Sequence, residues 1–142
     1  SQVPQSENFL RLRLPEVEKV FTQFAIDEKN LVLDGIDIQP GGFRIRSHDL
    51  YGPLPDIVIE DTGDRYPVLD KITRETAKLI AMVRDRQDLR GIFRGCVFLL
   101  PTSTEKGSIV GIRFMGKTVF AESPSLWEAY HELIRKAVEH FL

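Results

Sequence analysis

The sequence is poor in the residues that build several common classes of functional site. Cysteine occurs once among 142 residues, at position 96, so an intramolecular disulfide framework is excluded. Lys and Arg number 19 against 21 Asp and Glu, and the net charge of -2 leaves no global cationic field for sequence-independent nucleic-acid binding. No apolar run approaches the roughly 20 residues of a membrane-spanning helix. We therefore expect a cytoplasmic protein that does not span a membrane.

The usual motifs of phosphate and zinc sites are also missing. The glycine pair at 41–42 lacks the Lys-Ser/Thr that follows in a phosphate-binding loop. Neither Cys-x-x-Cys nor His-Glu-x-x-His occurs, and the spacing of His131 and His140 places them on opposite faces of a helix. Cys96 opens the apolar run 96–100, which predicts a buried, inert thiol.

What is present is typical of a soluble globular domain. Hydrophobic residues make up 42% and charged residues 28% of the chain, and 142 residues suit a single core. The first residues are polar, so we expect a flexible lead-in over residues 1–13, followed by one α/β domain over residues 14–142.

Apolar periodicity predicts the order of the elements. A helix is expected from Leu14 and a strand at 30–38, followed by strands at 43–46, 55–61 and 66–70, a helix at 73–88, a buried strand at 93–100, a hairpin at 109–114 and 117–121, and a helix at 125–140. Because a helix joins the strands at 66–70 and 93–100, we expect a mixed α/β sheet with flanking helices. The spacing of four aromatic residues predicts that they belong to the core: Phe114, Phe120, Trp127 and Tyr130.

Two carboxylates are predicted at the ends of neighbouring short strands. Asp56 opens the strand at 55–61, and Asp70 closes the strand at 66–70, directly before Lys71. Two such carboxylates can bind one divalent cation, and the lysine can orient the attacking water or stabilise the charge of a phosphoryl transition state. Oxygen ligands favour Mg²⁺ or Mn²⁺ over zinc. The alternative is that the acids only terminate strands and that Lys71 is a solvated charge.

These features resemble the PD-(D/E)xK nuclease superfamily, and within it the nuclease-like domains of restriction-system proteins of the McrC kind. In that family a helix carrying a Glu precedes a hairpin, a Pro-Asp strand, an Asp/Glu-x-Lys strand, a helix and a further apolar strand. The resemblance covers residues 14–101, with residues 55–60 similar to the first motif and residues 68–71 similar to the second. It implies a restriction-endonuclease-like core.

The resemblance also implies roles for individual residues. Asp56, Asp70 and Lys71 would be catalytic, and Asp56 and Asp70 would bind Mg²⁺ or Mn²⁺ together with Glu16 or Glu18 of the first helix. The family places its lysine two positions after the acid, whereas this chain has Ile there. Lys71 on a regular strand would face away from Asp70, so either a bulge corrects the spacing or the site is degenerate.

Basic residues gather in two places. Arg44 and Arg46 project from one face of the first hairpin, and Arg84 and Arg90 lie in a basic cluster at the end of the second helix. These four arginines are candidate contacts to nucleic-acid phosphates. A solvated face of mixed charge is the alternative.

Two functions are therefore expected from different classes. The first is a nuclease-like domain that hydrolyses phosphodiesters with a metal ion, or a degenerate derivative that binds nucleic acid. The second is a non-catalytic module for protein–protein interaction, or a regulatory subunit of a larger complex. The isoelectric point near 5.9 and the displaced lysine favour the second. A homodimer or a larger assembly fits either function.

Overall fold

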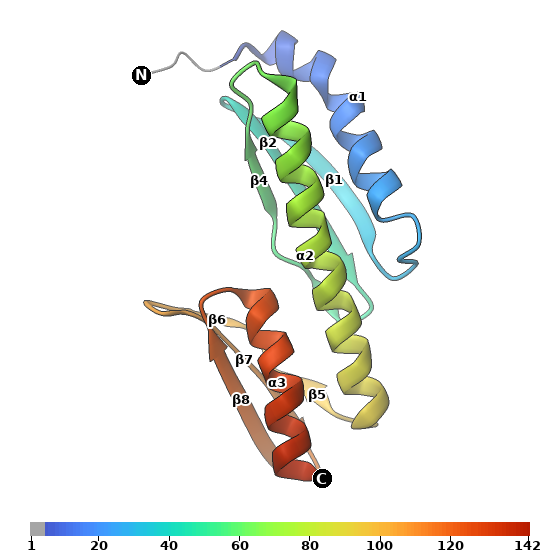
Figure 1. Cartoon of the computed structure of the whole chain (residues 1–142), viewed down its shortest axis with the longest axis vertical. Helices are drawn as coiled ribbons and strands as arrows, with labels where there is room; N and C mark the ends of the chain where they lie inside the picture. Colours follow the sequence, from blue (N-terminus) through green and yellow to red (C-terminus); the bar gives the residue numbers. More distant parts are fainter. Residues whose placement is uncertain (1–4) are drawn as a thin grey trace. The chain divides into compact units, whose positions relative to one another are not determined.

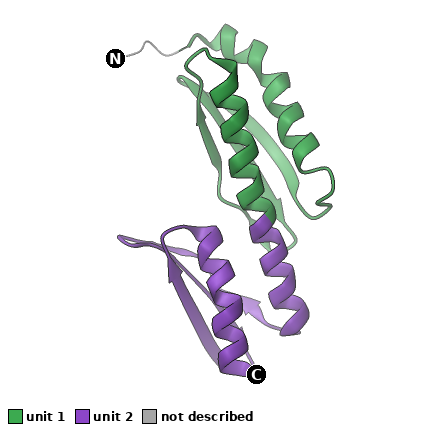
Figure 2. Cartoon of the chain, in the orientation of Figure 1, with its two compact units in different colours: residues 1–80 green, residues 81–142 purple. Residues whose placement is uncertain are grey.

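The computed structural model describes residues 5–142, and residues 1–4 of the predicted lead-in lie outside the described residues. The chain divides into two compact units, Ser1–Ile80 and Ala81–Leu142 (Figure 2). Helix α2 (Arg65–Ile92) contributes its first part to unit 1 and its second part to unit 2. Each unit has its own antiparallel sheet.

Sheet A belongs to unit 1 and has β2 (Gly42–Asp49) at its centre. β1 (Val32–Gln39) pairs with one edge of β2, and β3 (Gly52–Pro53) and β4 (Ile57–Glu60) pair with the other. All of these pairings are antiparallel. The strands at 30–38, 43–46 and 55–61 are thus confirmed in position, with shifted ends.

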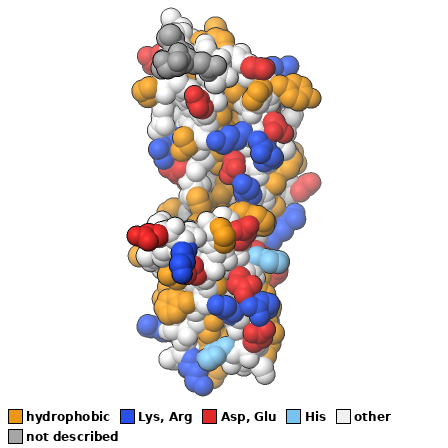
Figure 3. Space-filling model, turned by 60° about the vertical axis from the view of Figure 1, so that its left-hand side comes forward, with side chains coloured by type: hydrophobic (Ala, Val, Ile, Leu, Met, Phe, Trp, Pro, Cys, Tyr) orange, Lys and Arg blue, Asp and Glu red, His pale blue; other side chains and the backbone are white. Residues whose placement is uncertain are grey.

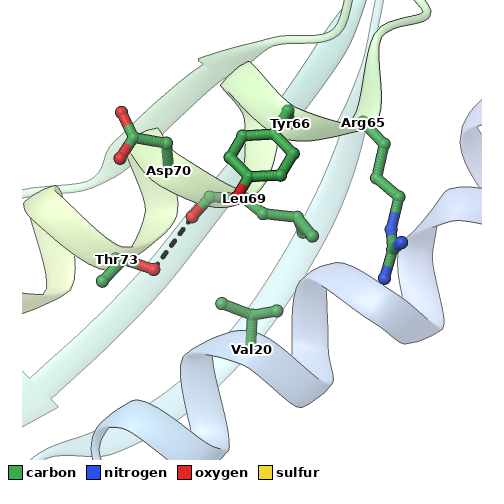
Figure 4. Close-up of a pocket in the computed structure, with 6 residues that line it drawn as sticks. All are labelled: Val20, Arg65, Tyr66, Leu69, Asp70 and Thr73. Atoms are coloured by element: carbon green, nitrogen blue, oxygen red, sulfur yellow. Dashed lines mark hydrogen bonds between the residues drawn. The ribbon is translucent and has the colours of Figure 1, made fainter.

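One face of sheet A is apolar and the other is polar. Phe43 and Ile45 of β2 are fully buried, whereas Arg44 and Arg46 between and beyond them point to the opposite face, because successive side chains alternate along a strand. Helices α1 (Glu7–Phe24) and α2 both lie over the buried face (Figures 1 and 4). They contribute buried side chains to this core: Leu10, Val17 and Phe21 from α1, and Val68, Ile72 and Leu79 from α2.

Helix α1 begins seven residues earlier than the sequence predicts, so the expected flexible lead-in is wrong from Glu7 onward. Ser6 is the N-cap, and its Oγ accepts a hydrogen bond of 3.2 Å from the backbone N–H of Phe9. Leu10 is fully buried and attaches this first part of the helix to the core. Polar composition alone hid the helix because most of its residues face solvent.

Helix α2 also begins earlier than predicted and replaces the expected strand at 66–70. Asp64 accepts a hydrogen bond of 3.2 Å from the N–H of Tyr66, which is the bond of a helix N-cap. Pro67 then falls in the first turn, where its missing N–H leaves no helical bond unmade. Pro67 is therefore compatible with a helix that begins at Arg65.

Sheet B belongs to unit 2 and has β7 (Gly107–Phe114) at its centre. The short strands β5 (Val97–Phe98) and β6 (Thr102–Thr104) pair in succession with one edge of β7, and β8 (Lys117–Ser123) pairs with the other. The β7–β8 turn is Met115-Gly116, with φ of 50° and 78°, as in the two-residue turns that suit the twist of a hairpin. The hairpin predicted from the sequence is confirmed.

Helix α3 (Leu126–Phe141) covers one face of sheet B (Figure 1). The core between helix and sheet is built from small and aliphatic side chains, namely Val110, Ile112, Val119 and Ala121 of the sheet and Ala129, Leu133 and Ala137 of the helix. Phe114 lies 5.4 Å from both Phe93 and Phe141, ring centre to ring centre, in edge-to-face contacts. This aromatic cluster closes one end of the core.

The structure confirms the α/β class, with three helices and two antiparallel sheets within residues 5–142. The predicted adjacency of residues 66–69 and 93–100 in one sheet is wrong, because the first segment is helical and only Val97–Phe98 of the second forms a strand. Trp127 is half-buried rather than central, and Phe120 is 54% exposed. Tyr130 is fully buried, as expected.

Candidate functional site

The first predicted metal ligand, Asp56, lies on the outer face of sheet A. It directly precedes β4, and its Oδ2 is 2.9 Å from Nη1 of Arg44. Arg44 alternates with the buried Phe43 and Ile45, so this ion pair lies on the face of the sheet away from the helices. Asp56 is thus neutralised by an arginine that was itself expected to contact nucleic acid.

The second predicted motif, Asp70-Lys71, is on helix α2 and not at the end of a strand. Asp70 Oδ2 lies 3.0 Å from Nε of Arg74, one helical turn away. Lys71 is exposed, and consecutive residues of a helix point about 100° apart. Helix α2 covers the inner face of sheet A (Figure 1), whereas Asp56 pairs with Arg44 on the outer face, so the sheet separates Asp70 from Asp56. The structure therefore does not bring the predicted catalytic residues together.

Glu16, the expected third ligand, is on helix α1 and is held by two arginines. Its Oε2 is 3.6 Å from Nη1 of Arg13, and its other oxygen pairs with Nε of Arg65. Within residues 5–142 no group of three His, Cys, Asp or Glu side chains is arranged to hold a metal ion. Asp56, Asp70 and Glu16 instead each have an arginine partner.

A cavity of about 350 Å³ lies between α1 and α2 (Figure 4). Its lining comes from both helices, namely Val20, Arg65, Tyr66, Leu69, Asp70 and Thr73. Thr73 Oγ1 donates a hydrogen bond of 2.9 Å to the Leu69 carbonyl, and Asp70 supplies the single carboxylate of the lining. This volume is at the lower end of the range of small-molecule sites, but one carboxylate is too few to build a two-acid hydrolytic centre.

A buried ion pair that no sequence motif predicted joins α1 to the residue after β4. Asp61 is 2% exposed, and its Oδ2 lies 3.1 Å from Nε of Arg13. Its Oδ1 accepts a 2.9 Å hydrogen bond from the N–H of Gly63, which closes the turn before α2. The pattern Asp-Thr-Gly was the signal for this turn. The contacts are structural, since both carboxylate oxygens are occupied by the chain itself.

The arginines expected to contact phosphates fall in both units. Arg46 binds Asp37 through two hydrogen bonds, of 2.7 and 3.3 Å, and Arg44 binds Asp56. Arg90 donates a 2.7 Å hydrogen bond to the Cys96 carbonyl, and Arg84 is exposed on α2. On the face drawn in Figure 3, basic and acidic side chains are interspersed. The intramolecular pairing of Arg44 and Arg46 leaves less of their charge for phosphate binding.

Two ionisable groups of unit 2 are perturbed by burial. Cys96 is fully buried, and burial raises the pKa of its thiol, so the expectation of a buried cysteine is confirmed. Burial likewise raises the pKa of the Asp85 carboxyl, whose Oδ2 lies 3.7 Å from Nδ1 of His131. Neither group belongs to a cluster of three His, Cys, Asp or Glu side chains that could hold a metal ion in the described residues.

The outer face of sheet B, opposite α3, is the remaining candidate site. Strand register places three rows of side chains on it: Val97, Arg113 and Thr118; Leu99, Gly111 and Phe120; and Thr102, Ile109 and Glu122. Val97 is 57% and Phe120 54% exposed, although both are large apolar residues. At Gly111 a Cβ would lie 2.8 Å from the Phe120 ring, so the phenyl group crosses β7 over this glycine.

Comparison with known proteins does not assign a function, so the proposal for a function rests on the geometry of the structure. Neither a protein-family model nor a curated protein matches this sequence. Among residues 5–142, no helix has both the length and the apolar character that crossing a membrane requires.

Proposed function

We propose that this chain is a non-catalytic protein-interaction module and that it binds protein through the outer face of sheet B. The observation that carries the proposal is the exposure of Phe120 and Val97 on the face of sheet B opposite α3. Leu99 and Ile109, which are partly exposed, join them into one apolar surface.

An apolar surface of this kind suits a protein partner better than a nucleic acid. Contiguous apolar area on a soluble domain is costly to hydrate, and it is typical of protein interfaces, whose centres are rich in aromatic side chains. Arg113 and Glu122 lie at the margin of the surface, where charged residues of an interface usually lie. Phe120 is the natural anchor residue, because it is aromatic and central.

Metal-dependent phosphodiester hydrolysis is supported less well. Hydrolysis by this route needs carboxylates that converge on one cation, and the chain holds Asp56 and Asp70 on opposite sides of sheet A, each bound to an arginine. A regulatory subunit of a larger complex is consistent with the same exposed face. The nuclease hypothesis is tested by assaying the purified chain for cleavage of DNA or RNA with Mn²⁺.

The proposal is tested by placing a photo-crosslinking phenylalanine analogue at position 120 in cells of the source organism. Val58, which is 47% exposed on the outer face of sheet A, is the matched control position. We expect crosslinks at position 120 to one defined protein, identified by mass spectrometry, and none at position 58. Absence of adducts at 120, or the same adducts at both positions, contradicts the proposal. Cleavage of DNA or RNA by the purified chain with Mn²⁺ would favour the nuclease.

A further inference from the structure

The free edge of β8 differs from the other sheet edges of the described chain. The β1 edge carries a bulge and two acids, β4 follows Asp56 and ends at Glu60, and the β5–β6 edge is interrupted by Pro101. Bulges, charges and prolines are the usual means by which edge strands are kept from pairing. β8 has seven residues, no proline and an uncharged centre at 119–121.

The backbone of β8 presents regularly spaced hydrogen-bonding groups at this edge. Phe114 and Lys117 flank the two-residue turn and close the ladder as a hydrogen-bonded pair. Hydrogen-bonded pairs alternate with non-hydrogen-bonded pairs along an antiparallel ladder. The N–H and C=O groups of Thr118, Phe120 and Glu122 are therefore directed away from β7, towards the open side.

We propose that a second copy of this chain pairs with β8, so that two copies of sheet B form one continuous antiparallel sheet about a two-fold axis at Phe120. The inference rests on the proposed function and names the partner. Phe120 lies opposite Phe120 of the second copy, and Thr118 lies opposite Glu122 of the second copy. Both pairs join residues whose backbone groups are directed outward, so the ladder is complete.

The side chains select this register over its neighbours. A shift of two residues in one direction would place Phe120 opposite Thr118, and a shift in the other would place it opposite Glu122 and beside its charge. In the proposed register Phe120 lies opposite Phe120 of the second copy with no charged residue opposite it, and each ring lies over Gly111 of its own chain. On the inner face Val119 lies opposite Ala121 of the second copy, and both are buried side chains of the core.

Charge complementarity supports a second copy as the occupant. Arg113 lies beside Thr118 on the outer face, and no carboxylate among the described residues pairs with it. Glu122 receives a neutral hydrogen bond of 2.8 Å from Thr104 Oγ1. Within one chain Arg113 and Glu122 lie four residues apart along the ladder, too far to pair. In the proposed dimer Thr118 stands between Arg113 and Glu122 of the second copy, within reach of their long side chains.

The first experiment measures the mass of the full chain in solution at about 1 to 100 µM, a range that detects weak as well as standard interfaces. We expect concentration-dependent growth from 16.2 kDa towards twice that value. Arg113→Glu and Glu122→Arg should each weaken association about tenfold or more, because each creates like-charge pairs. The double variant should restore association. A monomer at every concentration, or no rescue by the double variant, would overturn the proposal.

The second experiment fixes the register without altering Phe120. A Thr118→Cys chain mixed with a Glu122→Cys chain should form a disulfide on oxidation, because opposite residues in a hydrogen-bonded pair lie within disulfide range. Each variant alone is the control and should stay uncrosslinked, since position 118 is distant from position 118 of its own partner. Cys96 does not interfere because it is fully buried. Crosslinking of either variant with itself contradicts this register.

Failure of the dimer and failure of the interaction function give different results. Crosslinks at position 120 to another protein, from a chain that is monomeric alone, would retain the function and reject self-pairing. Crosslinks to the chain itself support both. Absence of crosslinks at position 120 from a chain that dimerises would place the dimer contact elsewhere and would reject both the β8 edge and the proposed function.

Discussion

In both sheets a side chain lies across a glycine on the neighbouring strand, but the resulting outer faces differ: that of sheet A is charged and that of sheet B is apolar. In sheet A, Gly35 lies opposite Arg46, and in sheet B, Gly111 lies opposite Phe120. In each case a side chain crosses the bare glycine: an added Cβ would lie 2.6 Å from Arg46 Nη2 in one sheet and 2.8 Å from Phe120 Cδ1 in the other. Arg46 reaches a carboxylate of its own sheet, whereas Phe120 remains 54% exposed.

The charged side chains on the outer face of sheet A pair with one another, whereas the outer face of sheet B exposes apolar side chains. Two ion pairs, Arg44 with Asp56 and Arg46 with Asp37, cover the outer face of sheet A, together with a 2.6 Å hydrogen-bond contact between His48 Nδ1 and Asp34 Oδ1. Such a face gains little from a partner, because binding would require these charges to be desolvated. The apolar face of sheet B gains from every contact that removes it from water. An exposed apolar face is therefore a better candidate for a binding surface than a face whose charges are already paired.

The largest effect should separate the two faces of a single strand. Phe43→Ala removes a fully buried ring from the core of unit 1 and should lower the free energy of unfolding by about 3–5 kcal/mol. Arg44→Ala, at the next position, removes an exposed ion pair and should cost about 1 kcal/mol or less. Chemical denaturation of both variants checks this. Equal losses would mean that the outer ion pairs are structural.

A smaller effect should separate the two glycines. Gly111→Ala forces its Cβ against the Phe120 ring and also to 3.1 Å from the backbone oxygen of Val119, so a loss of about 1–3 kcal/mol is expected. Gly35→Ala meets only the mobile end of Arg46 and should be almost neutral. Thermal unfolding of the two variants makes the comparison. A larger loss of stability for Gly35→Ala than for Gly111→Ala would contradict this prediction.

The pH dependence of two matched substitutions should have opposite signs. Hydrogen bonds from Arg46 lower the pKa of Asp37, so this carboxylate stabilises the folded state above about pH 4 and the contribution is lost on acidification. Burial raises the pKa of Asp85. Because the ionised carboxylate is less stable in the folded state than in the unfolded chain, Asp85 lowers the stability of the fold as the pH rises above about 4.

Asp37→Asn should therefore lower the Tm at pH 7, and Asp85→Asn should raise it, with both differences shrinking towards pH 4. Glu105→Gln is the control, because it removes an exposed charge in unit 2. It should leave the Tm unchanged at both pH 4 and pH 7. The measurement is the Tm of each variant from pH 4 to pH 8. A destabilising Asp85→Asn would show that the contact with His131 outweighs burial.

The smallest effect expected is that of a divalent metal. Titration of the chain with Mn²⁺ in a calorimeter should give no saturable heat, because Asp56, Asp70 and Glu16 each have an arginine partner and do not converge. Asp70→Asn should leave the titration unchanged. Saturable heat that Asp70→Asn abolishes would restore the metal site and with it the nuclease hypothesis.

Local patterns were sufficient for the elements that a single stretch of chain determines. The apolar stripe of residues 125–140 predicted α3, and alternation of apolar and polar residues predicted the hairpins at 30–46 and 109–121. The polar lead-in and the strand at 66–70 were misjudged, because a short cap at Ser6 and at Asp64 redirects the backbone more strongly than composition suggests.

The sequence by itself determined the α/β class, the burial of Cys96 and the alternation that places Arg44 and Arg46 on one face. Only the tertiary structure decided which charged side chains pair with each other. Strand pairing brings Asp56 next to Arg44, and the turn of helix α2 brings Asp70 next to Arg74. The spacing of a nuclease motif predicts neither contact. The tertiary structure also decided that Phe120 is a surface residue. A period of two gives the face of a strand, but which of the two faces a helix covers depends on the packing of α3.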